Sequence, residues 1–373
     1  MADKVRTAII GCGKVSQWHI AALQRSSNAT CAAIYSRSME KARAFGEKYG
    51  LIPYDNITTM IREANIDAVI ICTPHPYHKD AVLEAAAAGA HCMVEKPLAS
   101  SLQDCDAMID ACKRAGVKLG MISQRRFLQP VQRVKQAIEE GKIGTPALGT
   151  VNVLGWRDQA YYDSDAWRGK WDTEGGGVMV NQASHQLDLL LWMMGDVEEV
   201  YGVWRNFNHP YVEIEDTAVA IVKFKNGGLG NIIVSNSMKP GIYGKIQVHG
   251  SNAASVGVQV DGGSMPLPGK PAAPYIPVND LWTVPGEEHL LDGWIKEDEQ
   301  LYNTVSMVEY PMQLQHEDFC DAILNDRPPA VDGEAGRKTV ELFTAVYRSN
   351  RDNAVVKFPL QPEDGDDYDG RKQ

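Results

Sequence analysis

Short apolar runs alternate with amphipathic segments through the first third of the chain. The runs that we expect to form buried strands are 5–10, 30–35, 67–72, 91–94 and 117–122. Apolar residues spaced three and four positions apart predict helices between them, at 15–23, 81–88 and 102–115. Ser100 or Ser101 is expected to cap the last helix, and Gly116 to close it. Alternating strands and helices predict five or six parallel strands with right-handed crossovers, a doubly wound α/β domain over residues 1–124.

The pattern changes beyond residue 124. Strands are expected at 149–154, 197–204, 218–224, 230–235 and 245–249, with Asn226-Gly227 as a hairpin turn between two of them. Helices are expected at 131–140, 313–324 and 336–349. Residues 238–303 are rich in glycine and proline and are expected to contain long irregular stretches. These elements predict an α+β domain with a large, mostly antiparallel sheet over residues 125–362, followed by an acidic tail, 363–373.

Composition restricts the possible partners and compartment. A net charge of −11 argues against nucleic acid or an anionic membrane surface as a partner. No apolar run approaches the roughly 20 residues of a membrane helix. Residues 1–4 lead directly into a strand, so no signal peptide is expected. The seven cysteines are odd in number and lack a Cys-x-x-Cys pair, which is typical of reduced thiols in the cytoplasm.

The turn after the first strand is a candidate dinucleotide site. It reads Gly11-Cys12-Gly13, and Lys14-Val15 opens the helix that follows. Glycines here let the backbone approach a pyrophosphate, which accepts hydrogen bonds from the helix amino terminus. The Gly-x-Gly-x-x-Gly fingerprint has Ser16 in place of its third glycine, a side chain small enough for close helix packing. We therefore expect cofactor contacts at this turn.

The end of the second strand bears on the choice between NAD and NADP. An acidic residue there binds the ribose hydroxyls of NAD, but this strand ends in Tyr35-Ser36-Arg37-Ser38. Ser36, Arg37 and Ser38 suit a 2′-phosphate, which leans towards NADP. If Arg37 instead stacks over the adenine, either cofactor fits. The predicted cofactor is therefore NAD(P).

Further candidate contacts follow the later strands, because ligands of open parallel sheets bind beyond the carboxyl ends of the strands. They are Thr73-Pro74-His75 with His78, then Glu95-Lys96-Pro97, then Gln124. The two histidines have no cysteine or carboxylate at ligand spacing, so no metal site is expected. Lys96, fixed by the following proline, is better placed for chemistry than for packing. The alternative is a surface lysine on a loop.

A second chemical cluster follows Gly175-Gly176-Gly177. From about residue 178 the apolar spacing is helical, so Asn181, His185 and Asp188 are expected on one helix face. Polar groups on an apolar stripe are costly when buried without partners, which favours a cleft. The alternative is a core histidine hydrogen-bonded to Asp188.

The segment before these glycines carries candidate sugar contacts. They are Arg157, Tyr162, Trp167 and Arg168. Aromatic faces stack on the C–H faces of a sugar ring, and guanidinium groups donate to its hydroxyls. The alternative is a packed loop with exposed cations.

Together these motifs resemble the Gfo/Idh/MocA family of sugar and cyclitol oxidoreductases. The resemblance rests on Gly11-Cys12-Gly13, Thr73-Pro74 with His78, Glu95-Lys96-Pro97, Arg125-Arg126-Phe127, Gly175-Gly176-Gly177 with His185-x-x-Asp188, and Pro328-Pro329-Ala330-Val331-Asp332-Gly333. These motifs span nearly the whole chain. The resemblance implies a Rossmann domain and an α+β domain whose open antiparallel sheet commonly forms the oligomer interface.

The resemblance also implies that Lys96 and His185 are catalytic and face the nicotinamide. Oxidation of an alcohol needs hydride loss and proton loss, and His185 suits the base at neutral pH. Asp188 would fix its tautomer, and Lys96 would polarise the reacting oxygen. The family often has Asp one turn before the histidine, where this chain has Asn181. An amide cannot shuttle protons, which leaves Asn181 to orient a substrate hydroxyl.

The expected activity is NAD(P)-dependent dehydrogenation of a ring secondary alcohol in a sugar, glycoside or cyclitol, with oxidation at sugar C3 as one variant. A reductase of a dihydrodiol or a linear tetrapyrrole is the enzymatic alternative. A non-catalytic regulator that binds nucleotide and sugar is the other, and the presence of both Lys96 and His185 argues against it. We expect a cytoplasmic homodimer or homotetramer that assembles through the second-domain sheet.

Overall fold

The chain forms two compact units in a computed structural model that describes residues 4–239, 241, 244–261 and 276–363. One unit comprises Met1–Gln124 with Ser306–Val340, and the other comprises Arg125–Val305 with Glu341–Gln373. The observed division differs from the predicted one at residues 306–340, which pack with the first unit instead of the second. The predicted acidic tail beyond Glu363 lies outside the described residues.

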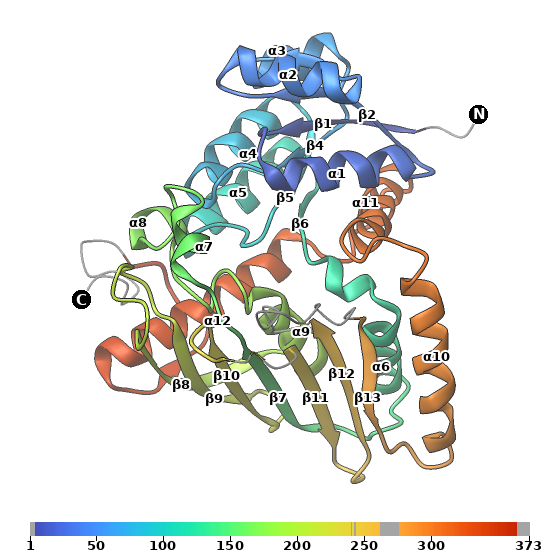
Figure 1. Ribbon diagram of the computed structural model, residues 1–373, viewed down its shortest axis with the longest axis vertical. Coiled ribbons are helices and arrows are strands. Elements are labelled where there is room, and N and C mark those ends of the chain that lie inside the picture. The colour runs from blue at the N-terminus through green and yellow to red at the C-terminus, as the bar shows by residue number, and fades with distance from the viewer. Residues whose placement is uncertain (1–3, 240, 242–243, 262–275, 364–373) are drawn as a thin grey trace. The chain divides into compact units, whose positions relative to one another are not determined.

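The first unit is built on a parallel sheet with the strand order β3-β2-β1-β4-β5-β6 (Figure 1). Its strands are β1 (Val5–Ile10), β2 (Ala29–Tyr35), β3 (Ile52–Tyr54), β4 (Ala68–Ile71), β5 (His91–Val94) and β6 (Leu119–Met121). Its helices are α1 (Lys14–Arg25), α2 (Met39–Tyr49), α3 (Ile57–Glu63), η1 (His75–Tyr77, a 3₁₀ helix), α4 (His78–Ala87), α5 (Leu102–Ala115) and α11 (Glu309–Leu324). This strand order confirms the predicted doubly wound fold, whose ligand crevice lies where the order reverses, beside β1.

Local capping explains where several of these helices begin and end. The Ser101 side chain accepts the N–H of Asp104, and Gly116 ends the same helix in the left-handed conformation, as the sequence predicts. The helices α2 and α3, which the apolar pattern did not reveal, begin with the same device at Ser38 and Asn56.

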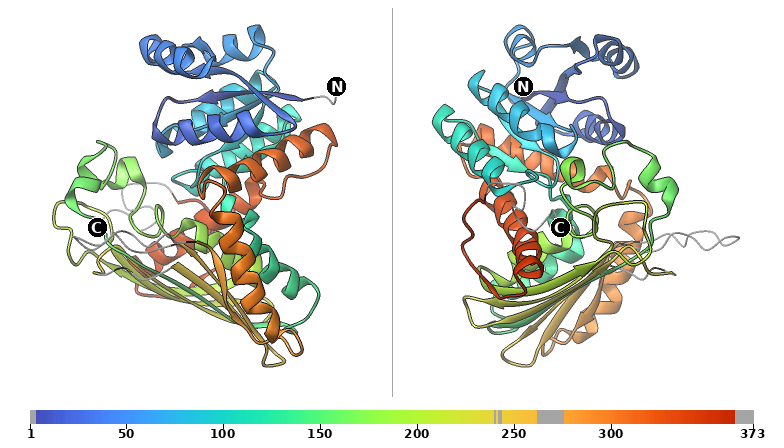
Figure 2. Two further views of the ribbon diagram at one scale, coloured as in Figure 1. Left: turned by 45° about the vertical axis from the view of Figure 1, so that its right-hand side comes forward. Right: turned by 90° about the vertical axis from the view of Figure 1, so that its left-hand side faces the viewer.

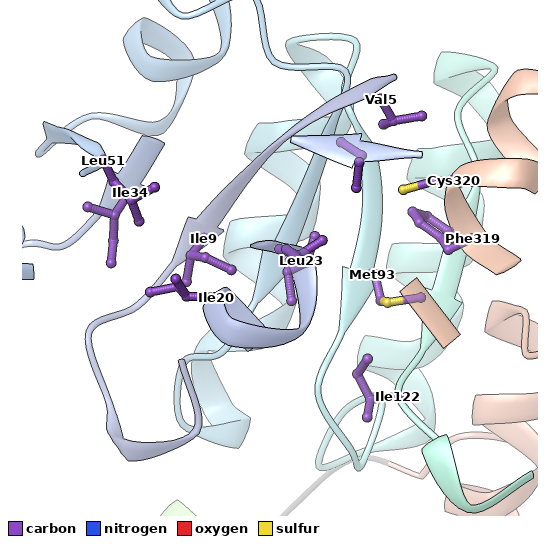
Figure 3. Packing of buried hydrophobic residues seen from close by; sticks show 13 residues of the cluster. Val5, Ile9, Ile20, Leu23, Ile34, Leu51, Met93, Ile122, Phe319 and Cys320 are labelled. Carbon is purple, nitrogen blue, oxygen red and sulfur yellow. The ribbon is translucent and has the colours of Figure 1, made fainter. Parts of the chain in front are cut away.

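Helix α11 completes the core of the first unit although it lies about two hundred residues downstream of the sheet. Its Phe319 and Cys320 are buried with Val5, Leu23 and Met93 in one apolar cluster (Figure 3). The absence of a side chain at Gly120 of β6 makes room, since a Cβ there would lie 3.1 Å from the Phe319 ring. Burial of this aromatic ring is worth roughly 1.5–3 kcal/mol, which favours docking of the helix against the sheet.

The second unit is built on a mixed sheet with the order β13-β12-β11-β7-β10-β9-β8-β14. Its strands are β7 (Pro146–Leu154), β8 (Val197–Arg205), β9 (Thr217–Phe224), β10 (Leu229–Ser235), β11 (Gly244–Gly250), β12 (Ser255–Asp261), β13 (Val278–Trp282) and β14 (Val356–Lys357). Its helices are α6 (Gln129–Glu139), α7 (Gln159–Asp163), α8 (Trp171–Glu174), α9 (Ser184–Met194), η3 (Glu288–Leu290) and α10 (Leu291–Tyr302). Two elements run from one unit into the other along the chain, η2 (Gln124–Phe127) and α12 (Gly333–Asp352). All strand pairs are antiparallel except β7–β10, which agrees with the prediction of a mostly antiparallel sheet.

Helices of the second unit cover one face of this sheet, as Figure 2 shows. Along β8 and β9 buried residues alternate with exposed ones, so the covered face is apolar. The opposite face is also apolar: Tyr201, Val203, Val219 and Ile221 are exposed there on paired positions of the two strands. None of the described helices is both long and apolar enough to cross a membrane.

Two predictions about local structure in the second unit are wrong. Residues 178–183 form turns, and α9 begins only at Ser184, so Asn181 does not share a helix with His185. Residues 238–303, where long irregular stretches were expected, contain β12, β13 and α10 in addition to β11, which matches the strand predicted at 245–249. The predicted Asn226-Gly227 hairpin is present, with Gly227 at φ +86° between β9 and β10.

Candidate active site

The Gly-rich turn after β1 has the geometry that a dinucleotide site needs. Gly11 has φ +115°, and a Cβ there would lie 2.9 Å from the carbonyl oxygen of Cys72. A Cβ on Gly13 would meet nothing within 4 Å, so the α1 amino terminus stays accessible. Ser16, the departure from the fingerprint, donates its hydroxyl to Gly11 O at 2.8 Å and accepts the Gly13 N–H at 3.2 Å. Ser16, in the first turn of α1, therefore holds the glycine turn in place.

The remaining predicted cofactor residues lie at the same edge of the sheet, because they follow β2, β4, β5 and β6. Ser36 accepts the N–H of Ser38 at 3.2 Å, and the Arg37 guanidinium lies 4.8 Å from the centre of the Tyr77 ring. Thr73 Oγ1 and Gln124 Oε1 are buried polar atoms that have no hydrogen-bond partner in the described part of the chain. Buried polar atoms usually have partners, so these two fit a polar ligand at this edge.

His78 differs from the other predicted cofactor contacts. Its ring is fully buried, with Nε2 2.8 Å from Thr73 O and Nδ1 3.1 Å from Pro97 O. Burial lowers the pKa of His78 below its ordinary value. The ring therefore lies between the end of β4 and the segment after Lys96, and as a neutral imidazole it donates to only one of these two sides.

Glu95 and Lys96 directly follow β5, which lies two places from β1 in the sheet. The Glu95 N–H donates to Ile71 O at 2.9 Å, which continues the pairing with β4. Its carboxylate accepts the Lys96 backbone N–H at 3.0 Å through Oε2. Lys96 is thus held at the carboxyl edge of the sheet, beside β4, which ends at Ile71.

The predicted sugar contacts of the second unit gather around a residue that the prediction omitted, Tyr161. The Arg168 guanidinium carbon lies 4.3 Å from the centre of the Tyr161 ring, and that of Arg157 lies 5.4 Å from it. The Tyr161 hydroxyl accepts from Arg168 Nη1 at 2.6 Å, Gln182 Nε2 at 2.8 Å and Asn181 Nδ2 at 3.2 Å. Burial raises the pKa of Tyr161, and the charge of Arg168 opposes that rise.

Asn181 is held by another residue that sequence reasoning missed, Glu174. The buried Glu174 carboxylate accepts Asn181 Nδ2 at 2.5 Å and the Gly169 N–H at 2.7 Å, and it lies 3.8 Å from Arg168 Nη1. Trp167 stacks with Arg168 at 4.4 Å, while Tyr162 is buried with its hydroxyl 3.5 Å from Asn236 Nδ2. An acid just before three glycines carried no recognisable motif, so the sequence offered no signal for Glu174.

His185 and Asp188 both lie on α9, one turn apart, and both are buried. Both Asp188 oxygens accept from the Arg126 guanidinium, at 2.7 Å from Nε and 2.6 Å from Nη2. Arg126 also lies 5.0 Å from the centre of the Trp192 ring on the same helix. Asp188 therefore anchors α9 to Arg126, an ion pair that the motif Arg125-Arg126-Phe127 did not reveal.

The turn before α9 is capped by a distant acid. Glu215 accepts the N–H groups of Gly177 at 2.7 Å and Met179 at 3.0 Å, and the hydroxyl of Tyr347 at 3.0 Å. Burial raises the pKa of Glu215 to about 7.

Among the described residues, no group of three or more histidine, cysteine or acidic side chains could hold a metal ion.

Comparison with known proteins supports the fold and the nucleotide site. A sequence model described as an oxidoreductase family with an NAD-binding Rossmann fold matches residues 5–123, and one for the GFO/IDH/MocA C-terminal domain matches residues 131–256. Myo-inositol 2-dehydrogenase of Thermotoga maritima is 32% identical over 255 residues, covering 66% of this chain and 73% of that protein.

Solved structures resemble nearly the whole chain. The WlbA dehydrogenase of Bordetella pertussis, in complex with NADH and UDP-GlcNAcA, is 32% identical with a TM-score of 0.84, covering 97% of this chain and 99% of that one. The WlbA dehydrogenase of Chromobacterium violaceum, with the same two ligands, is 29% identical with a TM-score of 0.80, covering 97% and 98%.

Proposed function

The chain belongs to the Gfo/Idh/MocA family of NAD(P)-dependent oxidoreductases, and from this we propose that it transfers a hydride between a ring secondary alcohol of a sugar or cyclitol and a nicotinamide cofactor. The observation that carries the proposal is the position of Lys96. It directly follows β5, at the same sheet edge as the Gly11 turn and the buried polar atoms of Thr73 and Gln124. Ligands of open parallel sheets bind at this edge.

We assign different tasks to the two catalytic residues. The nicotinamide, when bound, supplies the hydride acceptor. Lys96 donates to the reacting oxygen and stabilises the negative charge that develops there. His185 accepts the hydroxyl proton, because its ordinary pKa lies near neutrality. Asn181 takes no part in proton transfer, since its amide nitrogen donates to Glu174 and to Tyr161. The pairing of Lys96 with His185 rests on the family resemblance.

We also propose that the site takes both NAD and NADP. Residues 36–38, directly after β2, include no carboxylate that would repel a 2′-phosphate, and Arg37 adds a positive charge there. The two WlbA structures hold NADH, which supports NAD as one of the two. Fluorescence titration of the reduced cofactors should give dissociation constants within about tenfold of each other. Replacing Arg37 with alanine should weaken NADPH binding by about tenfold and leave NADH binding nearly unchanged.

Side chains of the second unit support the proposed substrate class. Tyr161, Trp167 and the two guanidinium groups of Arg157 and Arg168 combine aromatic faces with hydrogen-bond donors. A pyranose or cyclitol presents C–H faces and hydroxyl groups that match them. The WlbA complexes contain a UDP-linked sugar acid, so we include nucleotide-linked sugars in the proposed class.

We propose further that the chain assembles into a homodimer or homotetramer through the bare face of its large sheet. Tyr201, Val203, Val219 and Ile221 form an apolar patch on paired positions of β8 and β9. Contiguous exposed apolar surface of this kind marks an interaction site. A second copy of the same sheet presents a patch of the same chemistry, as a two-fold interface requires.

The proposed activity is tested by following reduced nicotinamide with a panel of free sugars, glycosides, inositols and UDP-sugars. Lys96→Met should lower turnover by at least a thousandfold while cofactor still binds, because the side chain that stabilises the developing charge is gone. Lys113→Met, which replaces an exposed lysine on α5, serves as the matched control. Wild-type turnover in Lys96→Met would refute the assignment, and cofactor binding without turnover on every substrate would favour a regulator.

A further inference from the structure

Two buried histidines, His19 and His316, form a chain of contacts with Glu95, whose carboxylate accepts the backbone N–H of Lys96. His19 on α1 is fully buried, with Nε2 2.8 Å from Glu95 Oε1. Its other ring nitrogen, Nδ1, lies 2.9 Å from Nε2 of His316 on α11, which is 1% exposed. The segments that meet here are nearly three hundred residues apart in sequence, yet all belong to the first unit.

These contacts fix where protons must lie. The Glu95 carboxylate only accepts, so His19 Nε2 carries a proton. One further proton must lie between His19 Nδ1 and His316 Nε2, because two lone pairs 2.9 Å apart repel. Either His19 is an imidazolium that donates to both neighbours, or His19 is neutral and His316 donates to it.

The surrounding charges favour the imidazolium on His19. Glu95 is 12% exposed, and an unpaired carboxylate in that setting would cost several kcal/mol. Burial alone would lower the pKa of His19, but Cys72 and Glu95 outweigh it and raise that pKa to about 10. Burial and the adjacent His19 lower the pKa of His316. The other ionisable groups that face Glu95 are Lys96 and, from α4, His78.

We propose that His19, as an imidazolium backed by neutral His316, holds Glu95 as a carboxylate and thereby positions Lys96. The carboxylate is bound at both ends: Oε1 to His19, and Oε2 to the Lys96 backbone N–H at 3.0 Å. The backbone of Lys96 is thus fastened through one side chain to α1 and α11. His19 and His316 are positioning residues, and their importance for catalysis rests on the proposed role of Lys96.

The protonation pattern is tested on the wild-type protein without any substrate. Nitrogen-15 NMR of labelled histidine distinguishes an imidazolium from a neutral ring, and His19→Gln and His316→Gln assign the two signals among the nine histidines. At pH 8 His19 should show two protonated nitrogens and His316 one. A neutral His19 at that pH would overturn the proposal. Cys72→Ser should leave His19 protonated. If His19 loses its proton in this variant, the negative charge that keeps it protonated comes from the Cys72 thiol and not from Glu95, and the proposal is overturned.

The positioning role is tested by a pair of variants at His316. His316→Gln keeps an oxygen that accepts from His19 Nδ1, whereas His316→Leu removes the acceptor from a site of similar size. The leucine variant should lower kcat by about 100-fold with KM nearly unchanged, since a displacement near 1 Å has that effect, and the glutamine variant should recover most of it. In the leucine variant the fall of kcat at alkaline pH should also begin at a lower pH, because the His19 imidazolium has lost an acceptor. His289→Gln, an exposed histidine of the second unit, is the control.

The outcomes separate this inference from the proposed function. Equal kcat values for the leucine and glutamine variants would overturn the positioning role even if Lys96→Met is inactive. If Lys96→Met retains full activity, the proposed function fails, while the NMR result still decides the state of His19 and Glu95. Should His316→Leu fold poorly, the wild-type spectrum and the kcat of His316→Gln carry the test.

Discussion

Breaking the Arg126–Asp188 pair should destabilise the second unit strongly, because neither residue has access to enough water to compensate. The Asp188 side chain is 1% exposed and that of Arg126 is 8% exposed. Two hydrogen bonds join them, at 2.7 and 2.6 Å. Removing one partner of a buried pair leaves an unpaired charge and costs about 3–5 kcal/mol. Arg126→Met and Asp188→Leu should each lower the free energy of unfolding by that amount.

A double-mutant cycle measures the coupling. When both charges are replaced, no charge is left buried, so Arg126→Met/Asp188→Leu should be more stable than either single variant, with a coupling of about 2–4 kcal/mol. Urea unfolding followed by tryptophan fluorescence gives the four values. Exposed Arg205→Met is the matched control and should change stability by less than about 0.5 kcal/mol. If the losses of unfolding free energy in the two single variants simply add in the double variant, the reasoning is refuted. It is also refuted if Asp188→Asn raises KM for substrate at unchanged stability, because that is the behaviour of a direct substrate contact.

Three further results are expected. Tyr161→Phe leaves three N–H donors without their shared acceptor and should lower the unfolding free energy by about 2–3 kcal/mol, whereas exposed Tyr211→Phe should not; equal effects would contradict the hydrogen bonding described. If the proposed oligomer forms, Ile221→Lys, at a position that is 63% exposed, should yield monomers in analytical ultracentrifugation, while Leu324→Lys on α11 should not; a monomeric wild type would exclude the interface. The pKa of His19 is raised from 6.5 to about 10 in the folded protein. Its contribution to the stability of the first unit should therefore be complete below pH 6.5 and should be lost as the pH rises through 10, by on the order of 3–5 kcal/mol. This loss should be absent in His19→Gln.

The sheet of the first unit was predictable because its signals are local. The buried strands β1 and β5 and helix α5 have the predicted bounds, since each apolar run ends at a glycine, a capping serine or a charged residue. The edge of the sheet that carries Gly11 and Lys96 follows from strand order alone. Ser16 shows the limit of the Gly-x-Gly-x-x-Gly motif, which has glycine at this position. Here the serine hydroxyl stabilises the turn by donating a hydrogen bond to Gly11 O.

The assignment of α11 to the first unit could not be read from periodicity. The pattern of α11 indicates a helix with a buried face, but an apolar face does not specify which sheet it covers. Helix α11 packs on the first sheet because the two surfaces are complementary in shape. Gly120 leaves room for the ring of Phe319, and His316 contacts His19. These are contacts between residues about two or three hundred positions apart, so no window along the chain contains both partners.

The segment 178–183 shows how a correct pattern led to a wrong element. Val178, Met179 and Val180 are all fully buried, which satisfies the apolar spacing without a helix. The N–H groups that a helix would direct along its axis are taken by Glu215, whose own carbonyl would lie 1.8 Å from a Cβ on Gly177. The acid that accepts these N–H groups lies 38 residues downstream of Gly177, and α9 itself begins at Ser184. The Asn181 side chain donates to Glu174, and Asn181 lies before the helix that carries His185.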